Sequence, residues 1–166
     1  MGTVTLRGNA TQIVDGFPAV GSQAADFHLV TKTLRDVHLS DYAGKKKLLS
    51  AVPSLDTGVC IASTKRFYEA AAGLDNVVLL VVSDDLPFAA TRVCADEEID
   101  KVETLSMMRS RSFAKDYGLL IEDGPLAGLC TRAVIVIDEN DKIIYTELVP
   151  EISQEPDYDK ALAALA

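Results

Sequence analysis

Two apolar runs constrain the fold of this chain more than any other feature. Residues 48–52 (LLSAV) and 76–83 (NVVLLVVS) are apolar almost throughout and show no polar–apolar alternation. A strand with one face in water alternates, whereas a strand that is covered on both faces is apolar along its length. The two runs therefore predict strands that are buried inside a sheet with helices on both faces.

Helical patterns alternate with these strands. The predicted helices cover residues 60–74, 86–95, 111–117 and 157–165. Further strands are predicted at residues 27–30, 37–39, 133–138 and 142–148, and a small N-terminal β-hairpin at residues 3–7 and 12–14. Strands that alternate with helices and then close in a hairpin indicate the α/β class, with a central mixed sheet flanked by helices. A thioredoxin-like fold fits this order.

The length favours one domain. A chain of 166 residues, 48% of them apolar, forms one domain or at most two very small ones. A chain of this length buries roughly 70% of its unfolded surface, so it needs no disulfide or metal in order to fold. No repeat or flexible linker divides the sequence. We expect a single domain over residues 1–166, with residues 1–16 as the hairpin extension.

The charge balance argues against two classes of partner. The chain has 16 Lys and Arg against 25 Asp and Glu, a formal net charge of −9. Binding to nucleic acid or to an anionic membrane surface depends on basic side chains, so we expect neither. No apolar run approaches the roughly 18 residues of a membrane span, and the N-terminal segment lacks the apolar core of a secretory signal. Three cysteines cannot form a closed disulfide framework, so we expect a cytoplasmic protein with reduced thiols.

Cys60 lies where a helix is predicted to begin, three residues after Thr57. The free N–H groups and the positive dipole end of a helix favour an anion there. Such a position lowers the pKa of a thiol and makes it reactive. A buried cysteine also packs like a small apolar side chain, so the position alone leaves both interpretations open.

Several segments resemble a known family. Residues 53–60 (PSLDTGVC) match the P-x-x-x-T-x-x-C pattern of peroxiredoxins, which reduce hydroperoxides. The chain further resembles bacterial thiol peroxidases, the atypical two-cysteine peroxiredoxins, at residues 83–89 (SDDLPFA), Cys94, residues 123–126 (DGPL), residues 132–134 (RAV) and residues 137–140 (IDEN). The resemblance covers nearly the whole chain, from the N-terminal hairpin to residues 155–158 (EPDY).

The resemblance implies a catalytic site of Pro53, Thr57, Cys60 and Arg132, with Cys60 as the peroxidatic cysteine. Lowering a thiol pKa from about 8.5 to about 6 raises the thiolate fraction at pH 7 only about 30-fold. Fast reduction of a peroxide needs more than this, so hydrogen-bond donors must also stabilise the negative charge that moves across the two peroxide oxygens. Thr57 can supply a hydroxyl, Arg132 a permanent cation, and Pro53 would close the pocket against water. Considered alone, Thr57 is an ordinary helix N-cap and Arg132 an ordinary solvated strand end.

The resemblance also implies the rest of the cycle. Cys94 would resolve the Cys60 sulfenic acid as an intramolecular Cys60–Cys94 disulfide, which thioredoxin would reduce. The family is usually a homodimer with a role in antioxidant defence, and no cofactor or metal is implied because the electrons pass through sulfur alone. A disulfide needs Cα atoms within about 7 Å, which two helices rarely provide, so we expect local unwinding after oxidation.

The role of Cys130 stays open. Cys130 has no role in the resemblance; it is a small buried residue, a backup resolving thiol or a site of damaging oxidation. A redox sensor or relay could use the same disulfide to control a partner. A thioredoxin-type disulfide reductase lacks support, because Ile61-Ala62-Ser63 follows Cys60 in place of a C-x-x-C motif.

Overall fold

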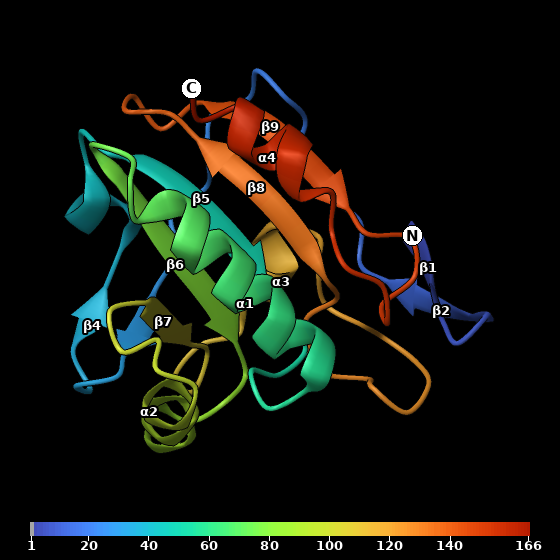
Figure 1. Ribbon diagram of the computed structural model, residues 1–166. Coiled ribbons are helices and arrows are strands. Elements are labelled where there is room, and N and C mark those ends of the chain that lie inside the picture. Colours follow the sequence, from blue (N-terminus) through green and yellow to red (C-terminus); the bar gives the residue numbers. More distant parts are fainter. Residues whose placement is uncertain (1) are drawn as a thin grey trace.

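The computed structural model describes residues 2–166, so Met1 of the predicted hairpin extension lies outside the described residues (Figure 1). A seven-stranded mixed sheet crosses the molecule in the order β4-β3-β7-β6-β5-β8-β9. Its strands are β3 (Leu29–Thr31), β4 (Asp36–Val37), β5 (Lys46–Ala51), β6 (Val77–Ser83), β7 (Glu103–Ser106), β8 (Ala133–Ile137) and β9 (Ile143–Leu148). The helices are η1 (Leu39–Tyr42), α1 (Gly58–Ala71), α2 (Pro87–Asp96), α3 (Ser112–Asp116) and α4 (Tyr158–Ala163).

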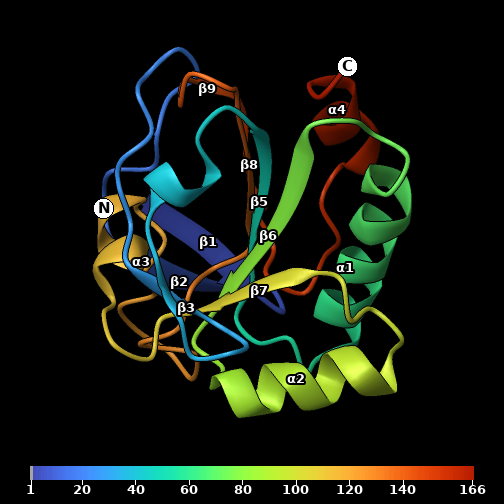
Figure 2. The same ribbon diagram turned by 90° about the vertical axis from the view of Figure 1, so that its left-hand side faces the viewer.

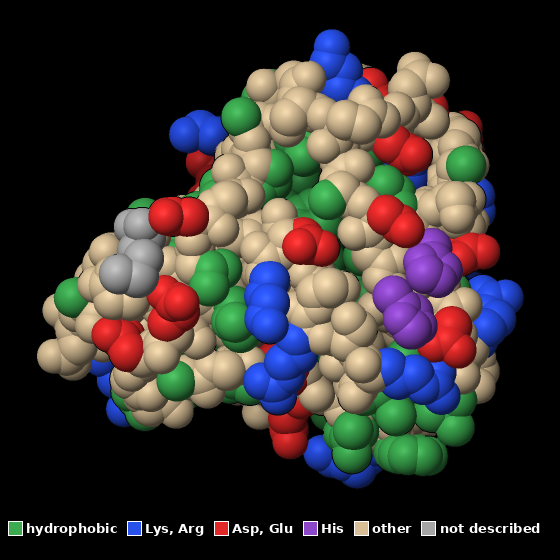
Figure 3. Space-filling view, turned by 180° about the vertical axis from the view of Figure 1, so that it is seen from behind, with side chains coloured by type: hydrophobic (Ala, Val, Ile, Leu, Met, Phe, Trp, Pro, Cys, Tyr) green, Lys and Arg blue, Asp and Glu red, His purple; other side chains and the backbone are tan. Residues whose placement is uncertain are grey.

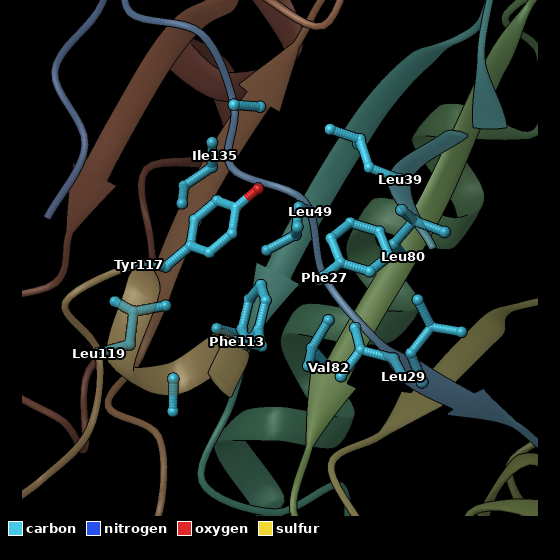
Figure 4. Packing of buried hydrophobic residues seen from close by; sticks show 14 of the residues in the cluster. Phe27, Leu29, Leu39, Leu49, Leu80, Val82, Phe113, Tyr117, Leu119 and Ile135 are labelled. Atoms are coloured by element: carbon cyan, nitrogen blue, oxygen red, sulfur yellow. The ribbon is translucent and has the colours of Figure 1, made fainter. Parts of the chain in front are cut away.

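The two apolar runs form the central strands β5 and β6, as predicted. They pair in parallel, and β8 pairs antiparallel with the other edge of β5. Successive residues of β5 enter different cores, because Leu48 packs in the cluster that contains Phe67 and Leu49 in the cluster that contains Phe113. Figure 2 shows α1 and α4 on one side of the sheet and α3 on the other, and Figure 4 shows the packing around Leu49. The prediction of a mixed sheet covered by helices is confirmed.

Strand β7 was not predicted. Its sequence, ETLS, is too short and too polar to read as a buried strand, yet Thr104 and Ser106 are both buried. β7 is held between β6, with which it runs parallel, and β3, with which it runs antiparallel. The Oγ of Ser106 donates a hydrogen bond of 2.6 Å to the carbonyl oxygen of Asp85, which satisfies the buried hydroxyl. This strand therefore forms because of its two neighbours in the sheet rather than because of its own sequence.

The elements that were predicted from the sequence have ends that differ from the observed ones by three residues or fewer.

The N-terminal hairpin of β1 (Gly2–Leu6) and β2 (Asn9–Ile13) is present as a separate two-stranded sheet. The carboxylate of Glu151 anchors it, accepting hydrogen bonds from Thr5 Oγ1 at 2.7 Å and from the backbone N–H groups of Arg7 and Gly8 at 2.9 and 3.1 Å. Hydrogen bonds from Ser153, Thr5, Gly8 and Arg7 hold the pKa of this carboxyl well below its usual range. The hairpin tip is thereby fixed beside residues 150–153. No helix within residues 2–166 combines the length and apolar character of a membrane span.

Gly118 follows α3, where the sequence predicted a glycine to end the helix. Its φ of +64° lies in the left-handed region. The chain also passes very close to it, because a β-carbon on Gly118 would lie 2.2 Å from the backbone nitrogen of Phe17. Two constraints therefore require glycine here.

We expect Gly118→Ala to lower the free energy of unfolding by about 3–5 kcal/mol, because it adds a backbone clash to left-handed strain. Gly44→Ala is the matched control: its φ is +79°, but its β-carbon would meet nothing within 4 Å. The control is expected to lose only about 1–2 kcal/mol. Equilibrium urea unfolding measures both losses, and equal losses would contradict the close approach at Gly118.

Candidate active site

Cys60 lies in the first turn of α1, at the carboxyl end of β5. Thr57 is the N-cap of this helix, and its Oγ1 accepts a hydrogen bond of 3.3 Å from the backbone N–H of Cys60. The same hydroxyl donates to the carbonyl oxygen of Ser54 at 3.4 Å. The Cys60 side chain is fully buried at the positive end of the helix, a setting that attracts negative charge on Sγ.

Arg132 reaches Cys60 because of strand pairing. It directly precedes β8, whose first residue Ala133 lies opposite Ala51 at the end of β5. The two strand ends therefore carry Arg132 and the loop before Cys60 to the same edge of the sheet. Arg132 Nη2 donates to Cys60 Sγ at 3.3 Å, and Nε donates to the carbonyl oxygen of Ile152 at 2.9 Å. Nη1 is buried without a hydrogen-bond partner within residues 2–166, so one donor of this buried cation is free.

A cavity of about 620 Å³ adjoins this contact. Three of the predicted site residues, Pro53, Thr57 and Arg132, line it together. The other lining residues come from the loop around Thr57, the hairpin tip and the loops near residues 125–129 and 152–153: Leu6, Arg7, Asn9, Ser54, Val59, Pro125, Leu126, Leu129, Ile152 and Ser153. Most of these side chains are apolar, so the cavity has a largely apolar wall that also includes the buried cation Arg132.

The structure does not bring Cys94 into this cavity. Cys94 lies on α2, is buried, and lines a second cavity of about 310 Å³ together with Lys32 and Thr91. Burial raises the pKa of the Cys94 thiol, and the positive charge of Lys32 opposes part of that rise. All three thiols are free, so this structure describes the reduced form of the chain.

Cys130 is fully buried, and its Sγ lies 3.9 Å from Met107 Sδ. Burial raises the pKa of its thiol strongly. These surroundings are those of a packing residue rather than of a nucleophile.

Two carboxylates at this site carried no role in the sequence analysis. Asp85 accepts hydrogen bonds from Ser54 and Leu55 in the loop before Thr57. It belongs to the segment SDDLPFA, which was singled out by resemblance alone. Glu151 holds the hairpin tip against the cavity, and no signal in the sequence pointed to it. Within residues 2–166, no group of three or more His, Cys, Asp or Glu side chains is arranged to hold a metal ion.

Comparison with known proteins assigns the family. A thiol peroxidase of Corynebacterium glutamicum is 48% identical over 165 residues, which cover 99% of each chain. A thiol peroxidase of Leptospira interrogans is 50% identical over 166 residues, covering 99% of this chain and 97% of its own. The family model described as Redoxin matches residues 19–162. The chain belongs to the redoxin family, among its thiol peroxidases.

The family assignment confirms the fold and the activity that the resemblance implied. The crystal structure of a peroxiredoxin-like protein from Aquifex aeolicus has a TM-score of 0.92 and 40% identity, over 98% of this chain and 95% of its own. The predicted thioredoxin-like fold is therefore confirmed. This redoxin is a thiol-dependent peroxidase, and hydroperoxides are its substrates.

We expect Arg132→Lys to slow the reaction of the reduced redoxin with hydroperoxide by about 10²–10³-fold, since one ammonium cannot reproduce the fork of donors on a guanidinium. Arg66→Lys is the matched control, because Arg66 is exposed on the same helix as Cys60 and stacks over Tyr158 instead. Competition with a second peroxidase for limiting hydroperoxide measures the rate constant. A rate within twofold of the parent protein would contradict a role for the guanidinium.

Proposed function

We propose that this protein reduces hydroperoxides with Cys60 as the attacking thiolate, Pro53, Thr57 and Arg132 as the peroxide site, and Cys94 as the resolving thiol. Thioredoxin then reduces the disulfide and restores both thiols. The repeated removal of hydroperoxides gives the protein a role in antioxidant defence. The single observation that carries this proposal is the position of Arg132, which donates a hydrogen bond to Cys60 Sγ and also lines the cavity.

In the first step, the Cys60 thiolate attacks the terminal oxygen of a hydroperoxide ROOH. An S–O bond forms while the O–O bond breaks, so Cys60 becomes a sulfenic acid and the peroxide gains two electrons. The leaving oxygen departs as RO⁻ and takes a proton from solvent to give an alcohol, or water when R is hydrogen. Donors from Arg132 stabilise charge that moves from sulfur to the leaving oxygen, and Thr57 Oγ1 accepts from the peroxide O–H.

The cavity supports alkyl hydroperoxides as substrates in addition to hydrogen peroxide. Its apolar lining residues include Leu6, Leu126 and Leu129. Burying an alkyl group against such a surface is favourable by about 25 cal/mol per Å², and hydrogen peroxide has no such group to bury.

In the second step, the Cys94 sulfur attacks the Cys60 sulfenic acid. The S–O bond breaks, a Cys60–Cys94 disulfide forms, and the hydroxyl leaves with the thiol proton as water. Both sulfurs are buried on different helices in this structure, and we expect part of α1 or α2 to unwind before they meet. A dithiol of thioredoxin then supplies two electrons and two protons, and the two cysteines return to the reduced state.

The decisive experiment is a non-reducing tryptic peptide map after one equivalent of cumene hydroperoxide. We expect a disulfide between peptides 48–65 and 93–101 and the loss of the peroxide, with repeated turnover once thioredoxin, its reductase and NADPH are added. Cys130→Ala should leave this link unchanged, whereas Cys94→Ser should abolish it.

Other results of this map would contradict the proposal in distinct ways. A link from peptide 48–65 to peptide 116–132 would move resolution to Cys130. Three free thiols beside intact peroxide would remove the cycle altogether. The expected link without turnover by thioredoxin would favour a redox sensor.

A homodimer is the proposed assembly, through an apolar patch of Leu86, Phe88 and Met108. Ser106 Oγ connects the two segments of the patch, because it donates to the carbonyl oxygen of Asp85 and accepts from the backbone N–H of Met108. The three apolar side chains are 52%, 68% and 41% exposed, and contiguous apolar surface of this kind marks a site of protein association. Figure 3 shows apolar side chains gathered at the end of the molecule that α2 forms. A second copy of the chain covers this patch in the proposed dimer.

We expect sedimentation equilibrium to give twice the mass of one chain and Phe88→Asp to shift it toward a single chain, because a buried carboxylate at the interface is costly. Leu74→Asp is the control. Leu74 is also an exposed leucine, at 39%, but it follows α1 and is not part of the patch. A Phe88→Asp variant that keeps the dimer mass would contradict this interface.

A further inference from the structure

The carboxylate of Asp85 joins the loop before Cys60 to the ends of the central strands. Its oxygens accept hydrogen bonds from Ser54 Oγ at 2.8 Å, from the backbone N–H of Leu55 at 2.6 Å and from Ser83 Oγ at 2.8 Å. Its own carbonyl oxygen accepts from Ser106 Oγ at 2.6 Å. One residue thus ties together the loop after β5, the end of β6 and the end of β7.

We propose that Asp85 is a positioning residue that holds the loop of residues 53–57 in the arrangement that reacts with peroxide, and so opposes the opening that lets Cys60 meet Cys94. This inference rests on the proposed Cys60–Cys94 disulfide. It concerns a residue that touches neither the substrate cavity nor either sulfur.

The anchored atoms lie between the groups that face the peroxide. Pro53 precedes the anchor and Thr57 follows it by two residues, and both line the cavity. Ser54 Oγ also accepts a hydrogen bond of 3.1 Å from the backbone N–H of Asp56, so the anchor extends along the loop. Hydrogen bonds to a carboxylate are about twice as strong as neutral ones. Asp85 therefore fixes the shape of the segment that sets the N-cap of α1.

Asp85 also stands at the base of the helix that carries Cys94. α2 begins two residues later at Pro87, and its N-cap, Leu86, offers no side-chain hydrogen bond. An uncapped helix end frays more easily than a capped one. Asp85 therefore lies at the boundary between a loop that it ties to the sheet and a helix that begins without a side-chain cap.

Other links between the two cysteine-bearing parts are more exposed. Asp56 pairs with Arg92 at 3.2 Å, and Lys65 pairs with Glu97 at 2.5 Å. Ion pairs in contact with water contribute little, because solvent screens them. Asp85, with its partly buried hydrogen bonds, is the stronger constraint on the loop.

The proposal has a signature that general destabilisation lacks: loss of Asp85 changes two steps in opposite directions. The reaction with peroxide slows, because a misplacement of about 1 Å at reacting groups costs on the order of 100-fold in rate. Disulfide formation from the sulfenic acid speeds up, because local opening requires less free energy. Faster closure leaves less time for a second peroxide, so less Cys60 sulfinic acid forms.

The experiment compares Asp85→Ala with Asp84→Asn in the full chain by rapid acid quench and mass spectrometry after a pulse of cumene hydroperoxide. Asp84 is the matched control, because its carboxylate contacts Arg111 and the backbone of Cys130 rather than the loop. For Asp85→Ala we expect oxidation of Cys60 to slow by about tenfold or more. We expect the first-order appearance of the disulfide to speed up severalfold and sulfinic acid at high peroxide to fall. Asp84→Asn should show neither change.

Two milder variants decide the question if Asp85→Ala does not fold. Ser54→Ala removes one donor to the carboxylate, and Asp85→Asn removes the charge while keeping the size; each should shift both rates in the same opposed directions by a smaller factor. Both rates unchanged, or both lowered, would overturn the role of Asp85. If the parent protein forms no Cys60–Cys94 disulfide, the proposed function itself fails; if it cycles while Asp85→Ala matches Asp84→Asn, only this inference fails.

Discussion

The contact between Arg132 and Cys60 depends on the pairing of β5 with β8. The two residues are 72 positions apart in the sequence. Cys60 is in α1 and Arg132 directly precedes β8, so neither belongs to a strand itself. The antiparallel register places the start of β8 beside the end of β5, so the guanidinium arrives next to the first turn of α1. If the register slipped by one residue, the side chains of β8 would point to the opposite face, and the cation would be lost from the site.

A buried cation has to be compensated, and the surrounding loop does so only in part. Arg132 gives one donor to the Ile152 carbonyl and one to Cys60 Sγ, while Nη1 is left without a partner within the described residues. A buried donor without an acceptor is unfavourable. In the proposed reaction, Arg132 uses its remaining donor capacity on the oxygens of the peroxide. Glu151 supports this arrangement from outside by fixing the hairpin against the residues beside Ile152.

In the proposed cycle, the site also has to permit a rearrangement that the hydrogen bonds around Cys60 oppose. Cys60 and Cys94 are buried on separate helices, and Cys94 lines a different cavity from the one beside Arg132. The hydrogen bonds of Thr57 and Asp85 favour the closed arrangement in which peroxide reacts. The start of α2 has no side-chain cap, so less holds this end of the helix closed. The lifetime of the sulfenic acid in that cycle would therefore depend on the balance between these two sets of interactions.

The sequence by itself determined the features whose causes are local. Continuous apolar runs predict β5 and β6 because burial on both faces leaves no place for polar side chains, and Thr57 lies one helical turn from Cys60, which is a fixed spacing. Only the tertiary structure decided what depends on distant pairing. Strand β7 forms because β3 and β6 hold it on either side, and Arg132, Asp85 and Glu151 acquire partners that no pattern of neighbouring residues specifies. The family resemblance named Arg132, but the geometry of its three nitrogens exists only once the sheet is assembled, because strand order and register set which side chains meet.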